Sequence, residues 1–274
     1  MVLVPDTFLY IVYIVNRYKC LTPLRRFGKT PSKGFFIYQQ KGFSMKRKTI
    51  VTALLVFLTL SIPLSLYSQS QDFQMNGTVL VKYNGSAANV TIPEGVTAIG
   101  DEAFINKRSI TSVTIPNSVT YIGDKAFDGC TSLTSITIPN SVTTIGIRAF
   151  YYCARLTDIT IPSSVTSIGD MAFSYCRNLT DITIPSGITS IGRSAFFSCQ
   201  NLTSVTIPSS VTSIGDMAFS RCTSLTSITI PSSVTSIAGW AFSYCTSLTS
   251  VTVSRRTTIG SSAFPSTARI TYSD

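Results

Sequence analysis

Apolar and polar positions follow one pattern through most of the chain, and a single unit illustrates it. Residues 202–224 read LTSVTIPSSVTSIGDMAFSRCTS. Val205 and Ile207 alternate with Thr206, which predicts a short strand with one buried face. Pro208 then ends the strand, because proline has no backbone N–H to donate to a neighbouring strand.

The second half of the unit predicts another extended piece and a turn. Val211 and Ile214 mark this second piece, and Gly215 is expected to let the chain turn. The segment that follows is too short for an independent helix. We therefore expect one helical or 3₁₀ turn that directs three apolar side chains inward: Ala218, Phe219 and Cys222.

The unit repeats with a period of 23 residues, counted between prolines at positions 93, 116, 139, 162, 185, 208 and 231. Ala-Phe pairs keep the same interval and end at Phe104, Phe127, Phe150, Phe173, Phe196, Phe219 and Phe242. An eighth pair ends at Phe264, one residue early, and Ser254 replaces the proline of that unit. A single coil has no second layer against which to bury its apolar side chains. The coils are therefore expected to stack.

The pattern L-x-x-V/I-x-I-P-x-x-V-x-x-I-G-x-x-A-F-x-x-C, over about residues 75–272, resembles the BspA-like, or Treponema-type, leucine-rich repeats. The resemblance implies an α/β solenoid. This is a curved right-handed superhelix with a parallel sheet on its concave side, built mostly of β-strands and turns with little helix. It also implies a secreted or surface protein of bacteria, or of some mucosal parasites, and several members are linked to adhesion to matrix proteins or to other bacteria.

The chain divides into five predicted segments. Met45 opens a basic, then apolar, then small polar stretch that predicts a cleaved signal peptide over residues 45–70, with a membrane anchor as the alternative. Residues 1–44 are interpreted as an extension ahead of the true start, or as a disordered leader. An N-terminal cap is expected over residues 71–92, with its turn at Asn84–Gly85. Repeats then fill residues 93–253, and a truncated capping repeat fills residues 254–274.

Charge is concentrated in the leader. The whole chain has 22 Lys and Arg against 12 Asp and Glu; residues 1–49 hold ten of the bases and one acid, which leaves twelve bases and eleven acids for the rest. A clustered basic face, which nucleic-acid binding requires, is therefore not expected in the body. Histidine is absent, and with it the usual general base of Ser-His-Asp and Cys-His sites. We predict no enzymatic activity, no cofactor and no membrane span in the mature chain.

Six cysteines share the 23-residue period: Cys130, Cys153, Cys176, Cys199, Cys222 and Cys245. An even count in an exported protein permits disulfides. Stacked equivalent residues, however, hold their Cβ atoms farther apart than a disulfide allows, so we expect buried thiols that pack as small apolar groups. Some pairing stays open, and a metal site is disfavoured because neither histidine nor a Cys-x-x-Cys pair is present.

Hydroxyl groups and two carboxylates decorate the predicted strands. Rows of threonine favour a solvated sheet face, with ice binding as a remote alternative. Asp158 and Asp181 replace the serine that other coils carry, on two adjacent coils. They are interpreted as solvated acids; a ligand or cation contact and a glycosidase-like acid pair are the alternatives.

The turn that enters each strand varies most, and its variation favours a binding surface because Tyr and Arg are enriched at interaction hot spots. Tolerated loop substitutions are the alternative. With Asp158 and Asp181, the candidate partner-binding residues are Tyr151, Tyr152, Arg155, Tyr175, Arg177, Phe197, Arg221 and Tyr244. We expect an exported or cell-surface scaffold that recognises a host or bacterial surface protein or glycan. A structural envelope or self-assembling spacer protein is the alternative. Trp240, the single tryptophan, has no assigned role.

Overall fold

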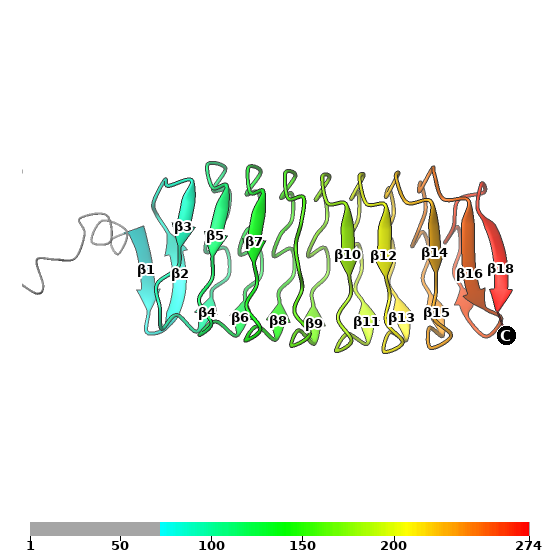
Figure 1. Ribbon diagram of the computed structural model, residues 1–274, viewed down its shortest axis with the longest axis horizontal. Helices are drawn as coiled ribbons and strands as arrows, with labels where there is room; N and C mark the ends of the chain where they lie inside the picture. The colour runs from blue at the N-terminus through cyan, green and yellow to red at the C-terminus, as the bar shows by residue number, and fades with distance from the viewer. Residues whose placement is uncertain (1–71, 274) are drawn as a thin grey trace, which may run out of the picture. The chain divides into compact units, whose positions relative to one another are not determined.

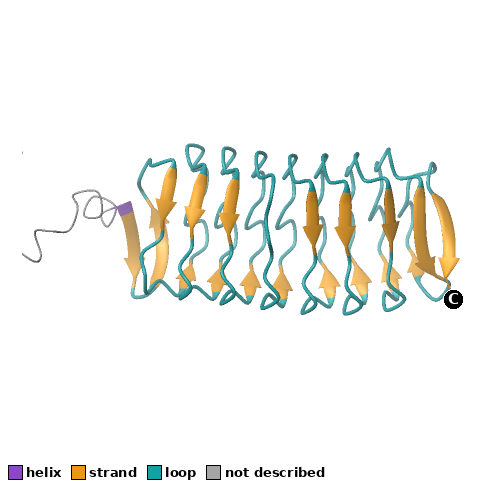
Figure 2. Ribbon diagram, viewed as in Figure 1, coloured by secondary structure: helices purple, strands orange, loops and turns teal. Residues whose placement is uncertain are grey.

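The computed structural model describes residues 72–273, which form one solenoid of stacked coils (Figure 1). Most coils contribute two short strands, joined by turns and loops (Figure 2). The predicted leader extension and signal peptide lie outside the described residues. Within residues 72–273, no helix is long and apolar enough to cross a membrane.

The strand before each proline belongs to a first ladder, which runs along one row of Figure 1. This ladder comprises β3 (Asn89–Thr91), β5 (Ser112–Thr114), β7 (Ser135–Thr137), β10 (Asp181–Thr183), β12 (Ser204–Thr206), β14 (Ser227–Thr229), β16 (Ser250–Ser254) and β18 (Arg269–Ser273). Paired strands are parallel, and most partners lie 23 residues apart, as in Asp181 with Ser204. The predicted coil is therefore confirmed as the stacking unit.

The extended piece after each proline forms a second parallel ladder. It comprises β4 (Ala98–Ile99), β6 (Tyr121–Ile122), β8 (Thr144–Ile145), β9 (Ser167–Ile168), β11 (Ser190–Ile191), β13 (Ser213–Ile214), β15 (Ser236–Ile237) and β17 (Thr258–Ile259). Its isoleucines point into the core; those of β9 and β17 are half-buried and the other six are buried. The second strand predicted from Val211 and Ile214 is thus present in shortened form.

An antiparallel hairpin begins the solenoid. β1 (Phe73–Asn76) pairs with β2 (Val79–Tyr83), and β2 then pairs in parallel with β4. The turn of this hairpin is at Asn76–Gly77, where Gly77 has a φ of +60°. It is not at Asn84–Gly85, where the sequence pattern placed it. The earlier pair carries the turn because the strand that follows it, Val79–Tyr83, is the one that folds back onto Phe73–Asn76.

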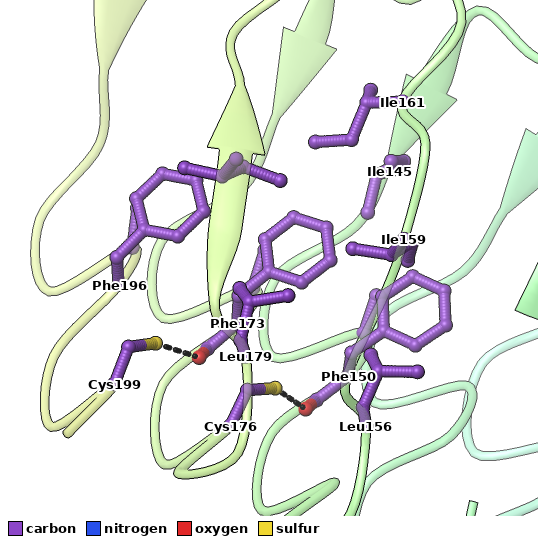
Figure 3. Close-up of a cluster of buried hydrophobic side chains, with 14 of the residues drawn as sticks. Ile145, Phe150, Leu156, Ile159, Ile161, Phe173, Cys176, Leu179, Phe196 and Cys199 are labelled. Atoms are coloured by element: carbon purple, nitrogen blue, oxygen red, sulfur yellow. Dashed lines mark hydrogen bonds between the residues drawn. The ribbon is translucent and has the colours of Figure 1, made fainter. Parts of the chain in front are cut away.

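A column of phenylalanine rings fills the centre of the solenoid. Neighbouring rings from Phe104 to Phe264 stack with centroids 4.9–5.4 Å apart and planes within 14° of parallel. Phe173 and Phe219 are fully buried, and Figure 3 shows adjacent rings of the column with the leucine and isoleucine side chains around them. Each ring is covered by the rings of the coils on either side, so the apolar core belongs to the stack and not to any one coil.

The six periodic cysteines are buried and unpaired, as predicted. Each thiol donates to the carbonyl of a phenylalanine 26 residues earlier, with sulfur–oxygen distances of 3.1–3.3 Å; Cys176 bonds to Phe150 and Cys199 to Phe173 in Figure 3. Burial raises the pKa of Cys176 to about 12. At neutral pH Cys176 is therefore a protonated thiol that acts as a donor to a main-chain oxygen.

The segment around each Ala-Phe pair consists of successive tight turns and not of the helical or 3₁₀ turn expected. In one coil, Ala218 donates to Gly215, and Cys222 donates to Phe219. The left-handed backbone that these turns need is taken by Met217 (φ +55°) and Arg221 (φ +63°), not by Gly215. Gly215 is required for another reason: a Cβ there would lie 2.8 Å from the amide nitrogen of Arg193 in the preceding coil.

Several coils have an aspartate directly after the repeat glycine, and these aspartates link neighbouring coils by hydrogen bonds. Oδ1 of Asp101, Asp124 and Asp170 each accepts from the backbone N–H of the residue one coil later, at 2.7–2.8 Å. Threonine hydroxyls also link neighbouring coils, but as donors; Thr143 Oγ1, for example, donates to the carbonyl of Thr120 in the preceding coil at 3.2 Å. Much of the periodic polar sequence thus serves contacts between coils.

The first ladder is interrupted twice and the second ladder once. Asp158 makes only an isolated bridge to Ser135, so its coil has no regular first strand, and β12 and β14 are not paired. In the second ladder, β9 and β11 are not paired. Gly187 lies beside this break, which we call the seam, and it lacks the serine hydroxyl that bonds the preceding coil elsewhere, as Ser164 does to Val142 at 2.7 Å. The phenylalanine column crosses the seam unbroken.

Candidate functional site: the turn edge

The turns after the Ala-Phe pairs lie one above another and form a continuous edge, here called the turn edge. Its second position after phenylalanine adopts φ between +56° and +73° in every coil from 104 to 245. The residues at this position are Asn106, Gly129, Tyr152, Tyr175, Ser198, Arg221 and Tyr244. Bulky residues rarely adopt this conformation, so three tyrosines and an arginine here occupy a backbone position that favours glycine.

Four of the predicted residues form one aromatic cluster: Tyr151, Tyr152, Tyr175 and Phe197. Tyr175 is its centre, with ring centroids 5.4 Å from Tyr151, 5.6 Å from Tyr152 and 5.3 Å from Phe197. The contacts to Tyr151 and Phe197 are edge-to-face, a favourable geometry for aromatic pairs. The cluster spans three coils, and its contact between Tyr175 and Phe197 crosses the seam.

Two arginines brace the cluster. Arg177, which the sequence predicted, lies 5.3 Å from the ring centroid of Tyr152 and 5.7 Å from that of Tyr175. Arg148, which sequence reasoning missed, lies 4.0 Å from the centroid of Tyr151. Both are cation–π contacts. In the described part of the chain, the buried Nε of each arginine has no hydrogen-bond partner. The sequence does contain a signal for Arg148: the equivalent positions of the adjacent coils hold Lys125 and Met171, so this position of the repeat is variable.

The remaining turn-edge residues do not join this cluster. Arg221 packs on Tyr244 at 5.0 Å and makes a separate pair two coils farther on; Tyr244 is 62% exposed. Arg155 is exposed. Trp240, which precedes the Ala-Phe pair of the coil of Tyr244, is 47% exposed. The structure thus brings most of the predicted set together in the aromatic cluster with Arg177. It leaves Arg221 and Tyr244 as an independent aromatic–cation pair.

Asp158 and Asp181 lie elsewhere, on the exposed face of the first ladder. Oδ1 of Asp181 accepts from the hydroxyl of Ser204 at 2.6 Å. Hydrogen bonds from Ser204 and Thr180 lower the pKa of Asp181 below its usual value, so this carboxylate is ionised at neutral pH. An acid pair would need one carboxyl with a raised pKa as proton donor, and Asp181 is shifted the opposite way.

Beside the aromatic cluster, the turn edge is hollowed into a cavity of about 440 Å³, here called the notch. It opens where Gly129 stands in place of the tyrosines of the next two coils. Its lining residues are Asn106, Arg108, Asp128, Gly129, Thr131, Tyr151 and Tyr152. Sequence reasoning missed the notch, although the glycine at an otherwise side-chain-bearing position of the repeat was its visible signal.

The electrostatics of the notch are fixed by one ion pair and one further cation. Asp128 Oδ2 lies 2.9 Å from a terminal nitrogen of Arg148. Burial of Asp128 raises its pKa, and the positive charges of Arg148 and Lys125 oppose that rise. Arg108, which also lines the notch, is exposed and makes no ion pair with any described residue. No group of three or more potential metal ligands occurs within residues 72–273.

Comparison with known proteins gives the family. A family model described as "BspA type leucine rich repeat region (6 copies)" matches residues 82–196 and 166–273. The crystal structure of a leucine rich cell surface protein from Faecalibacterium prausnitzii is similar, with 42% identity and a TM-score of 0.61. That match covers 66% of this chain and 52% of the other, so this chain spans about half the length of that protein.

A leucine rich repeat protein of Treponema pallidum is also similar, with 28% identity and a TM-score of 0.52 over 70% of this chain and 84% of that one. Among proteins of curated function, none is detectably similar to this chain. The 23-residue coil, the stacked ladders and the matched repeat model agree, and the chain belongs to the BspA-type leucine-rich repeat proteins.

Proposed function

We propose that this protein is an exported or cell-surface scaffold that recognises a protein or glycan partner through its turn edge, with no catalytic role. The observation that carries the proposal is the aromatic cluster braced by Arg148 and Arg177. Tyrosine and arginine are enriched among the few residues that dominate binding energy at protein interfaces, and here a stiff solenoid holds them in place.

Backbone conformation adds support. Tyr152 and Tyr175 adopt φ values of +58° and +63°, where glycine would be less strained. A side chain kept at such a position stabilises the fold less than it could, which is the pattern found where function selects the side chain. The description of the Faecalibacterium prausnitzii relative as a cell surface protein supports the proposed location.

The test replaces Tyr152, Arg155, Tyr175 and Arg177 together by Ala and measures binding to a panel of immobilised matrix proteins and a glycan array. The matched control replaces Thr137, Thr160, Thr183 and Thr206 by Ala on the first ladder. We expect the wild type and the control to bind a panel member and the turn-edge variant to lose that binding at unchanged unfolding midpoint. Equal binding by all three proteins would refute the site.

The same preparation tests the alternative of a spacer protein. Light scattering over a range of protein concentrations would detect self-association. Concentration-dependent assembly together with no binding to any panel member would contradict a recognition role and favour assembly. A monodisperse protein that binds a panel member through the turn edge supports recognition.

A further inference from the structure

We propose that the notch beside the aromatic cluster is a binding site for one acidic sugar residue, a pyranose ring that carries a carboxylate. This inference rests on the proposed function, because it names a ligand class for part of the turn edge. Asn106, Gly129 and Tyr152, which hold the same position of the repeat in three successive coils, all line the notch.

Gly129 leaves room for the side chain of Asn106 at the rim of the notch. A Cβ placed on Gly129 would lie 2.4 Å from Oδ1 of Asn106, so any larger residue would displace that amide. Glycine is not required there by the backbone alone. Tyr152, Tyr175 and Tyr244 hold the equivalent position at φ values of 58–63°, close to the 73° of Gly129. The glycine therefore leaves this position without a ring, whereas the next two coils carry a tyrosine there.

The walls of the notch have the mixed chemistry that a sugar ring needs. Tyr151 and Tyr152 form one wall, and their rings offer apolar faces against which the C–H face of a pyranose can pack. Asn106, Thr131 and Asp128 supply amide, hydroxyl and carboxylate groups that can donate to or accept from ring hydroxyls. A volume of about 440 Å³ lies within the range of small-ligand sites, and a few placed polar groups on an aromatic lining are typical of them.

The free charge of the notch selects an acidic ligand. The carboxylate of Asp128 is already neutralised by Arg148 at 2.9 Å. Arg108 is the cation left over, and its guanidinium can hold a carboxylate by two parallel hydrogen bonds. Arg148 itself is fixed, since it is held between Asp128 and the ring of Tyr151. A neutral sugar would leave the positive charge of Arg108 unmatched, whereas a uronate would pair with it.

The test titrates the protein with D-glucuronate, D-glucose and acetate and follows binding by protein-observed NMR. We expect saturable binding of glucuronate, binding of glucose weaker by about tenfold or more, and no saturable binding of acetate, because both the ring and the charge are needed. Arg108→Gln is expected to reduce the affinity for glucuronate to that for glucose. Gly129→Tyr is expected to abolish binding of both sugars by filling the notch.

Gly77→Tyr is the matched control for Gly129→Tyr. Gly77 has a φ of +60° and is exposed, and a Cβ there would meet no atom within 4 Å, so the variant carries the same backbone strain far from any cavity wall. It should bind glucuronate like the wild type. If Gly129→Tyr fails to fold, Arg108→Gln alone still decides the acidic selectivity.

Three results would overturn the proposal: no saturable glucuronate binding, equal affinities for glucuronate and glucose, or unchanged glucuronate binding by a folded Gly129→Tyr variant. None of these would touch the proposed function, which depends on loss of panel binding in the fourfold turn-edge variant. Conversely, glucuronate binding in the notch with no binding to any panel member would leave the sugar site standing and refute the wider recognition role.

Discussion

The phenylalanine column and the turn edge lie only a few residues apart in every coil, yet they follow opposite rules. From Phe104 to Phe242 the column repeats the same residue at 23-residue intervals, with near-parallel rings throughout. The turn edge holds Asn, Gly, Tyr, Ser or Arg at one equivalent position. A ring in the column must fit two neighbours of the same shape, whereas an edge residue faces solvent on one side and is free to differ.

The difference teaches where to look for recognition in such a solenoid. Uniform positions are explained by stacking, including the cysteines that bond to main-chain carbonyls; in some coils an aspartate adds a bond to an amide of the next coil. The positions that stacking leaves free are those that carry the aromatic cluster and the notch. Four predictions, ordered from the largest effect to the smallest, test this division.

The largest effect is expected for Phe173→Ala. Its ring is fully buried between Phe150 and Phe196, so truncation leaves a cavity and should lower the free energy of unfolding by about 3–5 kcal/mol. Phe197→Ala is the matched control, because it removes the same side chain from the half-buried turn edge; it should cost about 1 kcal/mol or less. Urea unfolding measures both. Equal costs would contradict the distinction between column and edge.

Alkaline pH should lower the free energy of unfolding of the solenoid through its buried thiols. Burial raises the pKa of Cys176 from 9.0 to about 12, so the folded state keeps a proton that the unfolded state releases. The stabilisation is complete below pH 9 and is lost as pH rises toward 12, by up to about 1.4 kcal/mol per thiol and pH unit. Urea unfolding from pH 8 to 10.5 in reductant, compared with Cys176→Ala, isolates this contribution. An identical slope in the variant would show that Cys176 does not titrate as proposed.

A smaller effect on stability is expected for the aspartates that link neighbouring coils by hydrogen bonds. Asp170 accepts from the amide of Arg193 at 2.8 Å, whereas the equivalent Asp216 makes no such bond within the described residues. Asp170→Ala should therefore lower the free energy of unfolding by about 1 kcal/mol, and Asp216→Ala by less than about 0.5 kcal/mol. Thermal and urea unfolding of the pair measure the difference. A larger loss of stability for Asp216→Ala than for Asp170→Ala would refute the role of Asp170 in linking two coils.

The smallest effect concerns amide exchange at the seam. The amides of Thr212 and Gly215 donate to Thr189 and Ile191 of the coil before them, but the equivalent bonds from Thr189 and Gly192 are not formed in the described structure. We expect the amide hydrogens of Thr189 and Gly192 to exchange at least about tenfold faster than those of Thr212 and Gly215. NMR-detected hydrogen exchange reads each site. Equal protection at both places would mean that the second ladder is continuous.

Sequence alone predicts the parts of this molecule that repeat. Pro208, Phe219 and Cys222 each recur at one interval, and that regularity is sufficient to define the coil and its buried side. Contacts between unlike residues of different coils are harder. The stacking of Arg148 on Tyr151 depends on side-chain direction, which spacing does not specify. The notch was missed because a missing side chain at Gly129 becomes a cavity only when its neighbours are known.

The hairpin shows a second limit of sequence reasoning. The chain contains Asn76–Gly77 and Asn84–Gly85, and both satisfy the same local turn rule. Which pair turns the chain is decided by long-range pairing, since β2 must leave the hairpin in register with β4. Likewise the glycine of the repeat was expected to supply a turn but instead permits close approach of two backbones. Local propensity cannot distinguish these roles.

The most direct test of this account is to delete one whole coil, residues 208–230, and compare it with deletion of half a coil, residues 208–219. Removing 23 residues keeps every later residue in register with the stack. We predict that this variant unfolds cooperatively, with a lower unfolding free energy and with five buried thiols that do not react until the protein is unfolded. We predict that the half-coil deletion does not fold. Failure of the whole-coil deletion to fold, or equal stability of the two variants, would contradict the nearest-neighbour stack on which the turn edge depends.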